Sequence, residues 1–179
     1  GGGLNILSCS PVVKNCFFTD NMALSGGGMS FTGGDLSVER CRFEENSANI
    51  GAGAYLNQGT VTLTDCTFVG NEAQEGMGED GSGGGIAIRS ADVDMYDSFM
   101  TGNTATGAGG GISASDSTLD ISGSEIRENE ASIAGGIFLE NTTTSIDTTR
   151  VCGNSPDQIV GPWTNDGNAA VRDSCSSIY

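Results

Sequence analysis

Apolar residues alternate with polar ones in steps of two along most of the chain. A period of two is the side-chain period of a β-strand, in which alternate residues point to the same face. Turn residues such as Gly33 and Gly34 separate one alternating stretch from the next. The pattern predicts three short strands in each repeat, with their apolar sides directed inward. The second repeat shows the three inward pairs, which are Met29 and Phe31, Leu36 and Val38, and Cys41 and Phe43.

A glycine-rich triplet followed by an apolar residue marks the start of each repeat. The triplets occupy residues 1–3, 26–28, 51–53, 83–85, 109–111 and 134–136, so their starts differ by 25, 25, 32, 26 and 25 residues. A helical solenoid fits this composition poorly, because each glycine would cost a helix about 1 kcal/mol. The spacing predicts a solenoid of β-strands, in which equivalent residues of neighbouring coils stack about 4.8 Å apart.

Two further columns of residues keep the same register as the triplets. We expect the first to be an amide ladder at a tight turn, because Asn tolerates left-handed backbone and its amide can bond to the coils above and below. We expect the second to be the central stack of the core. The ladder consists of Asn21, Asn46, Asn71, Asn103, Asn129 and Asn154, and the core stack of Phe18, Phe43, Phe68, Met100, Ile126 and Val151.

These columns define the expected domain organisation. Residues 1–154 are predicted to form about six coils of about 25 residues with three short strands each. Residues 155–179 depart from the repeat and are predicted to cap the last coil, with Ile159 and Trp163 covering it, because an open solenoid end exposes a sheet edge. The chain begins within a repeat, so we expect the native protein to continue on that side in further coils or another domain.

The pairing of an F-x-x-N motif with glycines before an apolar residue resembles a known group of repeats. It is similar to the right-handed parallel β-helix repeats of the pectin-lyase-like superfold, and in particular to those of polymorphic outer-membrane and autotransporter-like surface proteins. The resemblance implies an all-β, right-handed, single-stranded parallel β-helix, and it says little about activity, because such folds host many functions. The motifs are Phe18…Asn21, Phe43…Asn46 and Phe68…Asn71, with Gly85-Ile86 and Gly111-Ile112.

Charge narrows the classes of partner. The chain has 7 Lys and Arg against 23 Asp and Glu, no His, and a formal net charge of −16. This sign disfavours nucleic acid and anionic membrane surfaces, because phosphate contacts need a basic surface. It permits metal cations, basic partners and neutral glycans. No stretch reaches the roughly 18 apolar residues of a membrane span.

The six cysteines comprise a pair, a column of three and one residue, Cys9, that belongs to neither. Cys152 lies just past the last core position and Cys175 lies in the tail, which predicts a disulfide fastening the tail to the end of the solenoid. Cys16, Cys41 and Cys66 form an inward column, interpreted as small buried thiols in preference to a disulfide between adjacent coils. Cys9 is either a free thiol or a partner of Cys16. A disulfide would indicate an oxidising, extracytoplasmic setting.

Candidate chemistry lies on the outward positions. Asp92, Asp94 and Asp120 are on neighbouring rows, where stacked carboxylates could bind Ca²⁺, although a solvated acidic surface explains them as well. The Thr60, Thr62 and Thr64 row gives weak support to ice binding. No other cofactor is expected.

The long third repeat and one turn carry the other candidate sites. The third repeat holds an insertion, and insertions in solenoids project as loops and often bind ligands, so its Glu75, Met77, Glu79 and Asp80 form a candidate binding loop. Asn141 begins a glycosylation sequon, which matters only in a eukaryotic secreted protein.

These observations favour an extracellular or cell-surface structural or adhesive module: a rigid acidic scaffold within a larger surface protein or filament. Its expected partners are other coils or domains of the parent chain, further copies of itself, or a glycan. The alternative is a carbohydrate-binding or polysaccharide-cleaving β-helix of the lyase or hydrolase type, and a second alternative is a Ca²⁺-binding or ice-binding surface protein. No catalytic residues are assigned, because the carboxylates lack a partnering base and the chain has no His.

Overall fold

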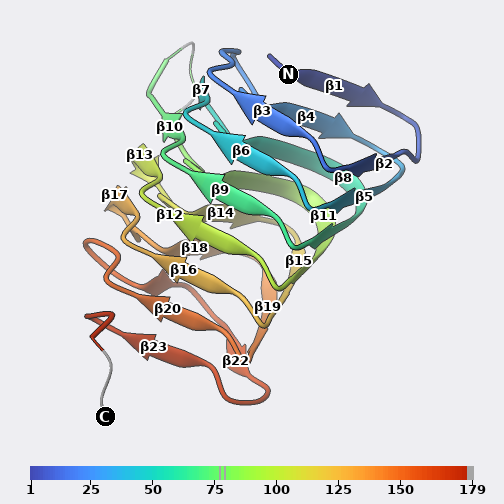
Figure 1. Ribbon diagram of the computed structural model, residues 1–179. Helices are drawn as coiled ribbons and strands as arrows, with labels where there is room; N and C mark the ends of the chain where they lie inside the picture. The colour runs from blue at the N-terminus through green and yellow to red at the C-terminus, as the bar shows by residue number, and fades with distance from the viewer. Residues whose placement is uncertain (77, 79, 177–179) are drawn as a thin grey trace.

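The computed structural model describes residues 1–76, 78 and 80–176. Within these ranges every regular element is a β-strand, and the strands form three parallel sheets of 12, 7 and 4 strands. Strands of successive coils lie side by side along a rod, with β1 at one end and β23 at the other (Figure 1). The chain is therefore a parallel β-solenoid of about six coils, as the sequence predicts.

The twelve-stranded sheet, sheet A, contains two columns of strands that meet at a bend. In the third and fourth coils the two columns join into the single strands β8 (Ala54–Thr64) and β11 (Ile86–Tyr96). The first column also contains β1 (Leu4–Leu7), β4 (Met29–Thr32), β14 (Ile112–Ser115), β18 (Ile137–Glu140) and β21 (Ile159–Val160). The second contains β2 (Val12–Lys14), β5 (Asp35–Glu39), β15 (Thr118–Ser122), β19 (Thr143–Asp147) and β22 (Thr164–Asn165).

The seven-stranded sheet, sheet B, carries the core stack. The register pairs Phe18 with Phe43, Phe43 with Phe68, and so on to Val151, as the sequence predicts. The Phe18 and Phe43 rings stack at 4.8 Å between centroids, and the Phe43 and Phe68 rings at 4.7 Å. The strands are β3 (Phe17–Thr19), β6 (Arg42–Glu44), β9 (Thr67–Val69), β12 (Phe99–Thr101), β16 (Glu125–Arg127), β20 (Arg150–Cys152) and β23 (Ala170–Arg172).

A fourth column, sheet C, was not expected from the sequence. It follows the ladder asparagines and consists of β7 (Ser47–Ala48), β10 (Glu72–Ala73), β13 (Thr104–Ala108) and β17 (Glu130–Ile133). Its buried alanines, Ala48, Ala73 and Ala105, form a small cluster of their own with Ala52. The three predicted inward pairs are present as strands, and sheet C adds a further short column, whose shortest strands, β7 and β10, have two residues with one inward Ala each.

The C-terminal segment continues the solenoid in shortened form. Its strands β21, β22 and β23 pair in parallel with β18, β19 and β20. Ile159 and Trp163 pack against the main core, as expected of a covering segment. The division into coils up to residue 154 and a cap beyond it stays a prediction, since this segment uses the same strand pairing as the coils.

The insertion of the third repeat lies between β10 and β11. At its start, the backbone amide of Glu75 donates to Thr106 Oγ1 at 2.7 Å. At its end, Ser82 pairs with Ile50 of the preceding coil in a parallel β-bridge. Two residues of the candidate loop, Met77 and Glu79, lie outside the described residues.

Candidate functional site

The predicted asparagine ladder is continuous. From Asn46 to Asn154, each Asn Oδ1 accepts both the backbone amide and the side-chain amide of the Asn in the preceding coil. For Asn71 these bonds come from Asn46 at 3.1 and 2.9 Å, and Asn71 Nδ2 in turn donates to Asn103 Oδ1 at 2.8 Å. The same pairs of bonds link Asn21 to Asn46, Asn103 to Asn129, and Asn129 to Asn154.

Gln158 ends the ladder, a role that the sequence analysis missed. Its Oε1 accepts the backbone amide of Asn154 at 3.0 Å and the side-chain amide of Asn154 at 2.8 Å. Gln158 therefore takes the place of a further Asn. It lies only four residues after Asn154, so the repeat spacing could not reveal it.

The backbone at this turn differs from the expectation in one respect. The left-handed residue is the one before each Asn and not the Asn itself, with φ of 54° at Glu45 and 65° at Gly102. The backbone of each Asn is not left-handed, so the tolerance of Asn for that conformation is not used here. The structural role of the Asn is its amide hydrogen bonds. The left-handed residues are Asp20, Glu45, Gly70, Gly102, Glu128 and Gly153.

The cysteine column belongs to a second ladder, made of thiols and hydroxyls. The backbone amide of Cys66 donates to Ser98 Oγ at 3.1 Å, and the backbone amide of Ser98 donates to Ser124 Oγ at 3.1 Å. Thr149 receives the backbone amide of Ser124 in the same way, at 3.2 Å. In the first coils the backbone amide of Cys16 points at the Sγ of Cys41 at 3.4 Å. In each of these pairs, a small side chain accepts the backbone amide of the equivalent residue in the preceding coil.

These thiols are free, in agreement with the interpretation favoured from the sequence. Cys41 and Cys66 are buried, Cys16 is half-buried, and Cys9 is exposed. Burial raises the pKa of the Cys66 thiol to about 11 and raises the pKa of Cys41 as well. Both buried thiols therefore stay protonated at neutral pH, where they are weak nucleophiles.

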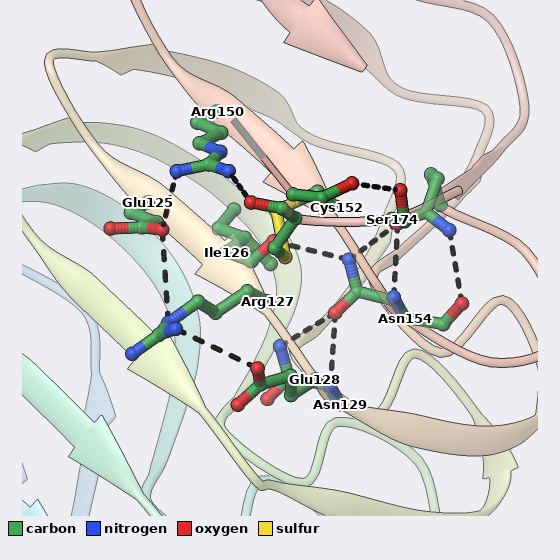
Figure 2. Close-up of a disulfide and its surroundings, with 12 residues drawn as sticks. Glu125, Ile126, Arg127, Glu128, Asn129, Arg150, Cys152, Asn154 and Ser174 are labelled. Atoms are coloured by element: carbon green, nitrogen blue, oxygen red, sulfur yellow. Dashed lines mark hydrogen bonds and ion pairs between the residues drawn. A yellow bond between two sulfur atoms is a disulfide. The ribbon is translucent and has the colours of Figure 1, made fainter. Parts of the chain in front are cut away.

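The predicted disulfide joins Cys152 to Cys175 at the corner where the ladder ends (Figure 2). A chain of charged side chains lies beside it. Arg150 donates to the carbonyl of Cys175 and lies 3.6 Å from Glu125, which also contacts Arg127 at 3.7 Å. Both the covalent bond and the Arg150 bond hold the tail against sheet B.

A hollow of about 280 Å³ opens on the outer face of sheet A, beside the insertion. Outward side chains of three neighbouring strands line it, including Arg89 on β11, Ser115 on β14 and Phe138 on β18. Asp80 and Ser82 contribute from the end of the insertion, where Ser82 Oγ donates to Asp80 Oδ1 at 3.0 Å. The hollow thus combines an aromatic ring, hydroxyls, a cation and carboxylates. Sequence analysis indicated the insertion but not the strands that complete this site.

A model of the right-handed β-helix region matches residues 1–95, which is more than half of the chain. This protein belongs to the right-handed β-helix family. The Chlamydia polymorphic membrane protein repeat matches residues 97–115 of this β-helix, a stretch that includes Asn103 and the glycines of the fifth triplet. No curated protein and no solved structure matches the chain.

The proposed Ca²⁺ ligands Asp92, Asp94 and Asp120 form an acidic row on sheet A, in which only Asp94 and Asp120 face each other across neighbouring strands. Asp94 and Asp120 are register partners on β11 and β15, whereas the register partner of Asp92 is Thr118. Burial raises the pKa of Asp94, and the neighbouring Asp120 and Asp92 raise it further. The described residues contain no group of three or more His, Cys, Asp or Glu placed to hold a metal ion. Ca²⁺ binding on this row stays a prediction.

The remaining candidates lie on separate parts of the β-helix. Asn141 is exposed at the turn after β18, and its Nδ2 lies 3.3 Å from Asp116 Oδ1. The row of Thr60, Thr62 and Thr64 is flanked by Asp35 and Glu39 on one side and by aspartates on the other, so it is not the flat row of threonines that ice binding would need. Within the described ranges no helix could cross a membrane.

Proposed function

We propose that this β-helix is a rigid acidic scaffold in a larger surface protein, with an extracellular structural or adhesive role. The scaffold role rests on the amide ladder, which runs without a break from Asn21 to Gln158. The surface setting is supported by the polymorphic membrane protein repeat, which matches in the middle of that ladder. A solenoid held by identical bonds in every coil resists bending, because each coil is tied to its neighbours along the whole length. Repeats of this kind also favour a longer parent chain with further coils.

The outward rows support a display role. One outward row of sheet A changes in character from coil to coil, from Ser37 to Thr62 to Asp94. The neighbouring inward row stays apolar, with Val38 paired to Leu63. Outward residues can vary in this way without disturbing the core, so a single scaffold can present many surfaces.

Two experiments test the surface role. Antibodies to the purified chain should label intact cells of the source organism, and mild proteolysis of intact cells should remove that label. Beads coated with the chain should adhere to cells or matrix proteins more than uncoated beads do. Labelling that requires permeabilised cells would contradict the surface location, and rapid turnover of uronate polymers by the purified chain would replace the scaffold with an enzyme.

The hollow on sheet A supports glycan binding as a second candidate function. Sugars stack on aromatic rings and bond to hydroxyls and charged groups, and Phe138, Ser115 and Arg89 line the hollow together. A glycan array probed with the chain should show binding that Phe138→Ala removes. Phe99→Ala on sheet B is the matched control, since Phe99 lies outside the hollow. Binding that survives Phe138→Ala would place the glycan elsewhere.

Ca²⁺ binding by Asp92, Asp94 and Asp120 is tested by titration calorimetry. Heat on addition of Ca²⁺ should vanish in Asp94→Asn if the acidic row binds the ion. No heat at millimolar Ca²⁺ removes the hypothesis.

A further inference from the structure

The hollow on sheet A exists because small side chains interrupt a row of large ones. On the outer face of the first column of sheet A, Ala87 and Ser113 are register partners on β11 and β14. The same row has Tyr55 before these two residues and Phe138 after them. The small side chains leave room over β11 and β14, and Phe138 lines that room from β18. Sheet A continues on both sides of the hollow, through β8 and β21 (Figure 1).

The two long sides of the hollow differ in polarity. One side is formed by the residues that precede the glycine-rich triplets, and it is mainly aliphatic. The other is formed by the outward residues two positions beyond the Ala87 row, and it is polar. Ile133 on the first side is 49% exposed, so part of the apolar surface is open to a ligand. The first side consists of Ile50, Ser82, Ala108 and Ile133, and the second of Arg89, Ser115 and Glu140.

The shape of the hollow suits a short, straight ligand. It spans β11, β14 and β18, whose parallel register is unbroken, and neighbouring strands lie about 4.8 Å apart. The hollow is therefore about 10 Å long in the direction of the rod. Two sugar rings joined by an extended β-linkage have this length. A ligand that lies along the hollow meets the aliphatic side with one edge and the polar side with the other.

Charge and polarity restrict the kind of sugar. Asp80 and Glu140 are the acidic lining residues and Arg89 the basic one, which gives the hollow a net charge of −1 in a chain of −16. Uronates and sulfated sugars are repelled by this sign. Among neutral sugars, the aliphatic side favours one with an apolar substituent. An acetamido group provides a methyl group for Ile133 and an amide that can bond to a hydroxyl such as that of Ser115.

We propose that the hollow binds a β-linked disaccharide of N-acetylhexosamine. The inference rests on the glycan-binding function proposed above and names its sugar. The acetamido methyl group packs on the aliphatic side at Ile133 and Ala108, and the sugar hydroxyls bond to the polar side at Ser115 and Glu140. The ring of Phe138 stacks on a face of the sugar.

Titration calorimetry of the full chain with three disaccharides tests the inference. N,N′-diacetylchitobiose, cellobiose and chitobiose share one linkage and carry an acetamido group, a hydroxyl and an amine at the same carbon. The chain should bind N,N′-diacetylchitobiose at least about tenfold more tightly than either of the others, because the apolar side discriminates by the added methyl group.

Two variants locate this preference in the hollow. Ile133→Ser should remove most of it, because the aliphatic side then loses its exposed member. Tyr96→Ser is the matched control: Tyr96 is also a large exposed side chain, at 40%, but it lies in the second column of sheet A, outside the hollow. The control should keep the full preference. Far-UV circular dichroism verifies that both variants fold.

The outcomes separate this inference from the function on which it rests. Equal binding of cellobiose, tighter binding of chitobiose, or equal loss of preference in Ile133→Ser and Tyr96→Ser would each overturn the inference. A glycan-array signal without binding of N,N′-diacetylchitobiose would overturn it as well and leave glycan binding in place. If the array is also silent, the glycan-binding function falls together with the inference.

Discussion

At the scale of the residue, stability depends on polar side chains that are buried and fully bonded. Asn71 shows this best: its Oδ1 accepts two bonds from Asn46, and its Nδ2 donates to the carbonyl of Phe43 at 3.0 Å and to Asn103. Removing such a group leaves several buried partners without bonds, and each costs about 1–3 kcal/mol.

Asn71→Ala should therefore lower the free energy of unfolding by about 3–5 kcal/mol. Asn49→Ala is the control, because the amide of Asn49 makes one bond at the surface, to the carbonyl of Gln74 at 2.9 Å. We expect it to cost less than about 1 kcal/mol. Urea unfolding followed by circular dichroism measures both values. Similar losses for the two variants would show that the ladder contributes no more than a surface bond.

The buried thiol of Cys66 predicts a loss of stability at high pH. Its folded pKa of about 11 lies above the ordinary value of 9.0. Between these values the folded state keeps a proton that the unfolded state releases, so stability is complete below pH 9 and falls as pH rises toward 11. The loss is on the order of 2 kcal/mol. Urea midpoints at a series of pH values measure it, and Cys66→Ser should flatten the curve. An unchanged pH dependence in Cys66→Ser would assign the effect to other groups.

At the scale of the element, the glycine triplets let neighbouring coils approach each other. A Cβ on Gly53 would lie 2.4 Å from the carbonyl oxygen of Gly85 and 2.9 Å from Phe68 Cδ1. Because Gly53 has no side chain, its backbone packs directly against the Phe68 ring and the backbone of the next coil. Gly102 is different: its φ is 65° and a Cβ there would meet nothing within 4 Å.

Gly53→Ala should destabilise the protein by about 3 kcal/mol, at the upper end of the cost of overpacking, because backbone of the next coil must move. Gly102→Asp should cost about 1 kcal/mol or less, since the equivalent position holds Asp20 and Glu45 with the same left-handed backbone. Thermal unfolding of the two variants checks the order. A Gly53→Ala variant as stable as the wild type would mean that the coils have room to separate.

At the scale of the whole molecule, each coil contacts mainly its neighbours, so stability can be lost from one end at a time. The short turn formed by β21, β22 and β23 has only small strands, and the Cys152–Cys175 bond closes it onto sheet B. The disulfide spans 23 residues, and closing a loop of about this size is worth about 3 kcal/mol in the chain-entropy description.

Cys175→Ser should therefore loosen the C-terminal turn while leaving the earlier coils folded. We expect limited proteolysis to cleave after residue 153 and hydrogen exchange to accelerate in β21 to β23, with little change in β4 to β12. Cys9→Ser, which removes an exposed free thiol, is the control and should change neither. Unfolding of the whole chain in Cys175→Ser would show that the last turn is needed for all the coils.

Much of the candidate site could be predicted from the sequence. Asn46 and Asn71 could be recognised as ladder partners because each lies 20 residues after the start of its glycine-rich triplet, and Cys152 and Cys175 could be paired from their places at the two ends of the last turn. Sheet C could not be recognised as strands, because a two-residue strand such as β10 has one inward Ala and shows no alternation, and Gln158 could not be found because it lies outside the repeat spacing.

The amino-acid sequence by itself determined the repeat, the inward columns and their register, because a solenoid stacks equivalent residues at a constant spacing and so turns distance along the chain into distance in space. Only the tertiary structure decided which outward side chains meet. The hollow beside Phe138 needs residues from three strands and an insertion, which lie far apart in the sequence. Such a feature depends on lateral neighbours and on the local depth of the surface, which no repeat spacing encodes.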